Sequence, residues 1–225
     1  MPRTARVAPG GLVYHVLNRA VARLRLFEKD ADYYAFEQVL AEAQAKHPTR
    51  ILGYCVMPTH WHFFTWPKED DELTQFFRWL THTHTMRWHA HHETVGTGHL
   101  YQGRFKSFPV QTDAHFYAVA RYVERNALRA NLVERAEHWR WSSVWRRCFG
   151  DADAKRLLSD WPVAMPDDWL DTLNCPQTDA ELQALRRSVQ RGCPYGDDRW
   201  QREIAVRLGL GHSLQARGRP RRTGA

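Results

Sequence analysis

The sequence has little cysteine, and its four cysteines are scattered along 225 residues. No pair among Cys55, Cys148, Cys175 and Cys193 has the spacing of a zinc finger or a thioredoxin-type motif. This absence argues against a zinc ribbon and against a secreted domain stapled by disulfides, so we expect a reduced, cytoplasmic protein. No apolar run approaches the length of a membrane span, and the first six residues lead into no signal-peptide core. We therefore expect no membrane partner.

Lysine is also scarce, because only five of the 32 basic residues are lysines and the rest are arginines. The formal net charge is nevertheless +7. Such a balance favours a polyanionic partner, and nucleic acid is the most common one. Arginine suits that partner because its planar fork contacts phosphate and stacks on bases.

The hydrophobic pattern alternates between strand-like and helical periods over the first two thirds of the chain. The predicted order is strand, helix, strand, strand, helix, strand, helix, over residues 12–19, 30–46, 50–57, 60–66, 73–90, 99–110 and 113–128. The two-residue connection between the second and third strands predicts an antiparallel hairpin. We therefore predict an α+β fold in which helices pack on a mostly antiparallel sheet, related to the ferredoxin-like plan.

The composition shifts near Gly150, which divides the chain into a first domain, residues 1–150, and an extension, residues 151–225. Two short helices are predicted in the extension, at 179–190 and 197–208. The chain then ends in a basic tail that contains Arg217, Arg219, Arg221 and Arg222. Such Arg-Gly-Arg-Pro tails can enter a DNA minor groove, although a solvated tail without a partner is the alternative.

The third predicted strand opens with two histidines, His60 and His62, on either side of Trp61. Alternate side chains of a strand share a face, so both imidazoles point the same way and Trp61 points the other way. Two neighbouring imidazoles can hold one metal ion. A pair of ordinary surface or core histidines is the alternative.

Five more histidines lie close together in sequence on the second predicted helix or just after it, at positions 82, 84, 89, 91 and 92. At helical spacing they spread around the axis. We therefore expect exposed or partly buried histidines here, not a metal site.

The third predicted helix carries an apolar stripe of Phe116, Val119 and Val123, and Tyr122 and Asn126 lie together on its flank, one turn apart. If the apolar stripe packs over the sheet, both side chains come near the strand that carries the histidine pair. A tyrosine beside a core stripe also has a purely structural explanation.

These segments together resemble the single-tyrosine HUH transposases of the IS200-like type, and most of all the REP-associated tyrosine transposases. The resemblance spans about residues 10–147 and rests on four ordered motifs at Tyr14–Arg19, Met57–His62, His99–Ser107 and Arg121–Ala130, with Trp141–Ser143 also matching. Family members often have Asn-Pro at Asn126-Ala127 and a glycine near Asn131, and these departures concern the end of the helix.

The resemblance implies that His60, His62 and Asn126 hold a divalent metal and that Tyr122 is the nucleophile. It implies Mg²⁺ or Mn²⁺, whereas imidazole ligands alone would suit zinc or manganese. Attack by Tyr122 on a phosphodiester would give a covalent 5′-phosphotyrosine and a free 3′-hydroxyl.

The DNA substrate implied by the resemblance is single-stranded or a hairpin, such as a REP palindrome. Arg19 lies in a basic edge after the first strand. Arg104 and Lys106 alternate with Phe105 along a predicted strand, so the two basic side chains share one face. Arg19, Arg104 and Lys106 are therefore candidate phosphate contacts.

Two other functions remain open: a non-catalytic DNA-binding protein on palindromic repeats, and a nicking enzyme of the replication-initiator or relaxase type. The resemblance implies a monomer acting in cis, with a dimer that lends Tyr122 to its neighbour as the alternative.

Overall fold

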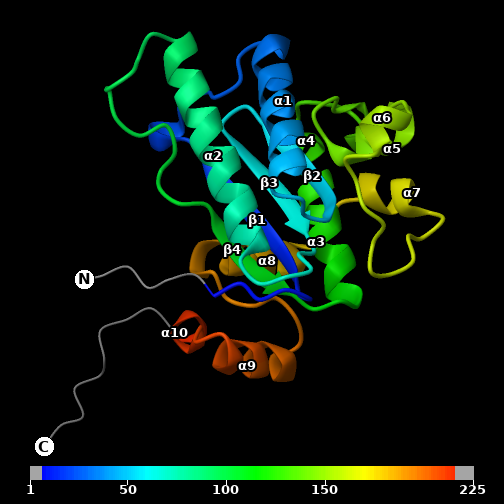
Figure 1. The fold of residues 1–225 in the computed structure, drawn as a ribbon. Coiled ribbons are helices and arrows are strands. Elements are labelled where there is room, and N and C mark those ends of the chain that lie inside the picture. Colours follow the sequence, from blue (N-terminus) through cyan, green and yellow to red (C-terminus); the bar gives the residue numbers. More distant parts are fainter. Residues whose placement is uncertain (1–6, 216–225) are drawn as a thin grey trace, which may run out of the picture.

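A four-stranded antiparallel sheet forms the centre of the protein in the computed structural model, which describes residues 7–215 (Figure 1). The strand order is β2-β3-β1-β4. The strands are β1 (Val13–Arg19), β2 (Ile51–Met57), β3 (His60–Thr65) and β4 (Lys106–Val110). The α+β fold with helices packed on an antiparallel sheet is therefore confirmed.

Helices cover both faces of this sheet (Figure 1). Two long helices, α1 (Asp30–Lys46) and α2 (Glu72–His91), lie on one face. The other face carries α3 (Ala114–Glu124), α4 (Asn126–Arg129) and α8 (Asp179–Arg191). The remaining helices are η1 (Val21–Arg23), η2 (Ala136–His138), α5 (Ser143–Phe149), α6 (Ala152–Lys155), α7 (Trp169–Asn174), α9 (Asp198–Arg207) and α10 (Gly211–Leu214).

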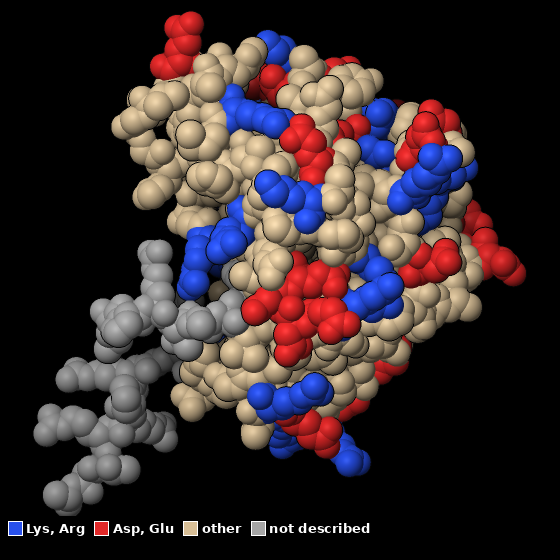
Figure 2. Space-filling model, viewed as in Figure 1, with Lys and Arg blue, Asp and Glu red and all other residues tan. Residues whose placement is uncertain are grey.

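The core under α1 and α2 is dominated by aromatic side chains. Trp61 and Phe63 point to this face from β3, and the ring of Trp61 stacks on Phe77 of α2 at 5.7 Å. Phe36 of α1 closes the cluster from the other side. Close packing of large rings stabilises this half of the fold. On the outer surface of α1 and α2, basic and acidic side chains are interspersed (Figure 2), so this face forms no continuous basic patch.

The opposite sheet face has a mixed character. Phe64 packs against Phe116 of α3, whereas His60 and His62 occupy the equivalent alternate positions nearer the start of β3. Apolar packing therefore holds α3 on the sheet at one end of the strand, and polar side chains lie under it at the other end.

The third predicted helix differs from the prediction in one respect. The sequence predicts one continuous helix over residues 113–128, but α3 ends at Glu124 and α4 begins at Asn126. Arg125 between them takes φ −83° and ψ 3°, outside the α-helical range. The strand expected over 99–110 is also shorter, since only Lys106–Val110 pairs as β4 and Tyr101 forms a single bridge to Ala20.

The two helices predicted in the extension are present as α8 and α9. Leu185 of α8 packs into the core beneath α3. The domain boundary at residue 150 remains a prediction. The basic tail with Arg217, Arg219, Arg221 and Arg222 lies outside the described residues. None of the helices between residues 7 and 215 combines the length and apolar character needed to span a bilayer.

Candidate active site

Strand pairing fixes which side chains surround the histidine pair. In the β1–β3 register, His60 lies opposite Arg19 and His62 lies opposite Leu17. On the other side of β1, Leu17 lies opposite Lys106 of β4. Directly paired residues share a sheet face, so Arg19 and Lys106 lie on the same face as both histidines.

A third histidine supports His62. Nε2 of His15 lies 2.8 Å from Nδ1 of His62, and the two rings stack with centroids 5.0 Å apart. Nδ1 of His60 lies 3.0 Å from the hydroxyl of Thr59. These contacts orient both rings of the pair through Nδ1 and leave each Nε2 atom without a hydrogen-bond partner within residues 7–215.

Burial keeps all three imidazoles neutral. It lowers the pKa of His15 to about 3 and that of His60 to about 4, with nearby arginine charges adding to the effect. The pKa of His62 lies well below its usual value, because burial and the two neighbouring histidines disfavour a positive charge there. A neutral imidazole retains the lone pair that metal binding requires.

Tyr122 lies directly over this cluster. Its ring centroid is 5.8 Å from that of His62 and 6.0 Å from that of His15, both in edge-on geometry. The side chain is only 7% exposed. Helix and strand therefore meet, which brings together two residues that are 60 positions apart in the chain.

Arg129 connects Tyr122 with Asn126. Its guanidinium carbon lies 4.2 Å from the centroid of the Tyr122 ring. One of its nitrogens donates to the backbone oxygen of Tyr122 at 3.2 Å, and another donates to Oδ1 of Asn126 at 3.0 Å. Within residues 7–215 Arg129 has no carboxylate partner, so its positive charge is available to an anionic ligand.

The Asn126 side chain is buried next to Arg129. Its Oδ1 accepts from Arg129, and its Nδ2 has no hydrogen-bond partner within residues 7–215. The oxygen keeps a second lone pair. A buried amide nitrogen without a hydrogen bond lowers the folding stability by about 1–3 kcal/mol. A cost of this kind is typical of side chains that serve a functional site.

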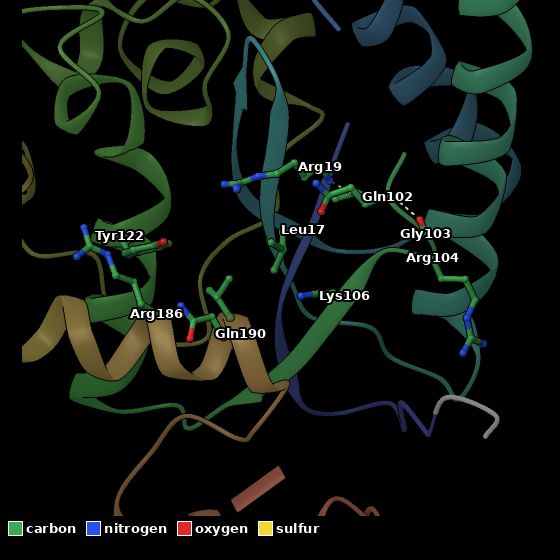
Figure 3. A pocket seen from close by; sticks show the side chains of 11 residues that line it. Leu17, Arg19, Gln102, Gly103, Arg104, Lys106, Tyr122, Arg186 and Gln190 are labelled. Atoms are coloured by element: carbon green, nitrogen blue, oxygen red, sulfur yellow. Dashed lines mark hydrogen bonds between the residues drawn. The ribbon is translucent and has the colours of Figure 1, made fainter. Parts of the chain in front are cut away.

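A cavity of about 450 Å³ opens beside Tyr122. In Figure 3 the Tyr122 hydroxyl points from α3 toward the strands. The cavity is lined by Leu17, Asn18, Arg19, Gln102, Gly103, Arg104, Lys106, Tyr122, Arg186, Val189 and Gln190. All three predicted phosphate contacts, Arg19, Arg104 and Lys106, thus line one cavity. The Arg104 guanidinium, however, points away from Tyr122 (Figure 3), so Arg19 and Lys106 are better placed.

Sequence inspection assigned no role to three residues of the site. His15 lies in a matched motif, but its contact with His62 depends on the pairing of β1 with β3. Arg129 follows Tyr122 by seven residues, beyond the break at Arg125, and its guanidinium lies over the Tyr122 ring. Arg186 comes from α8 of the extension, where the sequence predicted a short helix but not its position beside Tyr122.

The histidines of α2 are mostly exposed or partly buried, as predicted, with one exception. His84 is buried, and its Nδ1 lies 2.8 Å from the Tyr101 hydroxyl. His91 and His92 are exposed, but they lie close to Asp32, a neighbour that helical spacing alone did not predict.

Comparison with known proteins identifies the fold and the family of the chain. No curated protein sequence matches the chain. The chain shares its fold with a solved REP-associated tyrosine transposase bound to a REP hairpin, at 20% identity, a TM-score of 0.51 and coverage of 74% of this chain and 94% of that one. A crystal structure described as a putative transposase from Deinococcus radiodurans R1 also matches, at 15% identity and a TM-score of 0.40, over 53% of this chain and 92% of that one. The family model of IS200-like transposases matches residues 10–126, more than half of the chain, and the protein is therefore a member of the IS200-like transposase family.

Proposed function

We propose that this transposase cleaves and rejoins single-stranded DNA through a covalent 5′-phosphotyrosine at Tyr122. One observation carries the proposal. Tyr122 lies against His62 with ring centroids 5.8 Å apart, at the edge of a cavity lined by Arg19, Lys106 and Arg186. These side chains would supply a nucleophile, a metal ligand and positive charge for phosphate, which together support phosphodiester cleavage.

Tyr122 supplies the attacking oxygen. Its phenol oxygen forms a bond to phosphorus as the bond from phosphorus to the 3′-oxygen breaks. The phenol proton is released to water, and the 3′-oxygen takes up a proton and leaves as a hydroxyl. The new phosphotyrosine keeps the bond energy, so a 3′-hydroxyl can reverse the step without a nucleotide cofactor. Arg129 holds the Tyr122 ring and backbone in place and adds positive charge beside the reacting phosphate.

His60, His62 and Asn126 would hold the divalent metal. The donor set fits, because both imidazoles are neutral with Nε2 unpartnered, and Oδ1 of Asn126 keeps a free lone pair. Ligation through Nε2 of His62 requires its proton on Nδ1, where it donates to Nε2 of His15. When bound, Mg²⁺ or Mn²⁺ neutralises and orients the scissile phosphate.

The DNA strand would follow the cations of the cavity. Arg19 and Lys106 reach it from β1 and β4, and Arg186 reaches it from α8. The structural relative is bound to a REP hairpin, which supports a hairpin with a single-stranded flank as the substrate. Because Tyr122 and His62 of the same chain are already in contact, we propose that a monomer acts in cis.

The test is formation of a covalent adduct on a labelled hairpin oligonucleotide with Mn²⁺ or Mg²⁺. The wild type and Tyr117→Phe should form it, since Tyr117 lies on the same helix but its hydroxyl donates to the Ala164 backbone. Tyr122→Phe should bind the hairpin without forming it. Binding without any adduct by the wild type, across several hairpins, would favour the non-catalytic DNA-binding function.

A further inference from the structure

A second group of metal-ligand side chains lies away from the proposed active site. Asp32 in the first turn of α1 meets His91 at the end of α2 and His92 directly after it. One donor atom from each residue lies within 4.8 Å of the other two. These side chains belong to the helices on the aromatic face of the sheet, so they take no part in the chemistry at Tyr122.

Asp32 is held in place by the start of α1. Its Oδ2 accepts from the backbone nitrogens of Glu28 at 2.9 Å and Lys29 at 3.2 Å. The other carboxylate oxygen has no hydrogen-bond partner within residues 7–215. The carboxylate is thus oriented by one oxygen and free to bind a ligand through the other.

His92 is also partly fixed. Its ring stacks on Trp88 with centroids 4.0 Å apart, and the indole nitrogen of Trp88 donates to the backbone oxygen of Leu26 at 3.1 Å. The His91 ring meets His92 edge-on at 5.1 Å. Two of the three side chains therefore have defined positions, and His91 is exposed and can rotate toward them.

The two helices that carry the three residues are joined nearby. Arg87 of α2 forms a two-pronged ion pair with Glu42 of α1, with contacts of 2.7 and 2.8 Å. This exposed contact adds to the core packing between α1 and α2, which keeps the donors from the two helices near one another without an ion.

A donor set of two imidazole nitrogens and one carboxylate oxygen favours zinc among the common divalent metals. Zinc takes this donor set at about 2.0–2.2 Å in tetrahedral geometry, and it binds imidazole nitrogen more strongly than magnesium does. Tetrahedral bonds of that length place donors about 3.3 Å apart, so the exposed imidazole must close by on the order of 1 Å. The closure requires only side-chain rotation at the surface.

We propose that Asp32, His91 and His92 form a zinc-binding site that joins the start of α1 to the end of α2. Water fills the remaining coordination position. An ion bound there stabilises the folded protein in proportion to its occupancy, because the unfolded chain does not hold the three donors together. The proposal does not depend on the function at Tyr122.

Isothermal titration with Zn²⁺ and thermal unfolding test the proposal on the full chain without a histidine tag. All variants carry His60→Ala and His62→Ala, so that the proposed catalytic ligands do not contribute. The parent should bind one Zn²⁺ and its Tm should rise with zinc concentration. His91→Gln with His92→Gln should remove both effects. The control, His82→Gln with His99→Gln, removes two exposed histidines and should behave as the parent.

Asp32→Asn sharpens the test, because the amide oxygen can still accept the two backbone hydrogen bonds while the negative charge is lost. We expect its zinc affinity to fall at least about tenfold with the Tm of the zinc-free protein nearly unchanged. The proposal is wrong if the parent shows no saturable zinc binding. It is equally wrong if the His91/His92 variant binds as the parent does, or if the control loses as much affinity as that variant.

Discussion

The two faces of the sheet differ in composition although the same four strands form both. Under α1 and α2, Trp61 and Phe63 pack into a dry aromatic core. Under α3, the alternate residues His60 and His62 lie on the face that also carries buried His15. His62 contacts Tyr122, which lines a cavity. The strand period of two separates the two sets of side chains, so in the proposed function adjacent residues of β3 serve stability on one side and chemistry on the other. The rigid packing of the aromatic face can hold the buried polar side chains of the other face in positions that by themselves lower stability.

The adjacent residues His62 and Trp61 give the largest expected contrast. His62→Ala should slow cleavage by about 1,000-fold or more, because the loss of a proposed metal ligand would remove about 4 kcal/mol of charge stabilisation. Trp61→Ala should cost about 3–5 kcal/mol of unfolding free energy, since it empties the aromatic core. Single-turnover cleavage and urea denaturation of both variants measure the contrast. Equal losses of stability for the two variants would contradict the division of roles.

Arg129 tests whether side chains other than the proposed metal ligands organise the polar face. Arg129→Ala should slow cleavage by about 10- to 100-fold, because Tyr122 and Asn126 lose the group that positions them. Arg129→Lys should recover only part of the rate, since lysine lacks the planar fork. Arg125→Ala is the matched control, because within residues 7–215 the Arg125 side chain donates only to the Asn174 backbone oxygen, at 3.5 Å. A similar rate loss for both alanine variants would argue against the specific role of Arg129.

The buried His84 side chain should make the stability of the aromatic face depend on pH, because it is a titratable group. Burial lowers its pKa to about 3. The unfolded chain therefore binds more protons than the folded chain between pH 6.5 and 3, and stability falls as the pH decreases through that range. Each such histidine contributes about 1.4 kcal/mol per pH unit. Urea denaturation of wild type and His84→Gln from pH 7 to 4.5 should show a shallower pH dependence in the variant. Parallel curves would show that His84 is not buried as a neutral group.

The smallest expected effects are those of the cavity cations on DNA binding. Lys106→Ala and Arg186→Ala should each reduce the slope of log affinity against log salt concentration by about one, since each removes one phosphate contact. Arg156→Ala is the control, because Arg156 is paired with Asp153 on α6, which contributes nothing to the cavity. An Arg186→Ala slope equal to that of the wild type would show that α8 does not contact the strand.

The sequence was sufficient for the parts that depend on local periodicity. Alternation along β3 placed His60 and His62 on one face, and the apolar stripe of α3 placed Tyr122 near them. The break at Arg125 could not be foreseen in the same way, because nothing in the local residue pattern interrupts the helix there.

Contacts that depend on strand register, or on the packing of segments distant in sequence, also could not be predicted from the sequence. His15 meets His62 only because β1 pairs with β3, and Asp32 meets His91 only because α1 and α2 pack side by side. Residue type could identify candidates at these positions, but not which of them would be neighbours.

The most direct test of the central claim is to locate the covalent link on the protein. The adduct formed with a short hairpin oligonucleotide is digested with a protease and a nuclease, and the peptides are sequenced by mass spectrometry. The account predicts a nucleotide joined through its 5′-phosphate to Tyr122. A link to Tyr117 or any other residue, or a 3′-phosphate linkage, would contradict it.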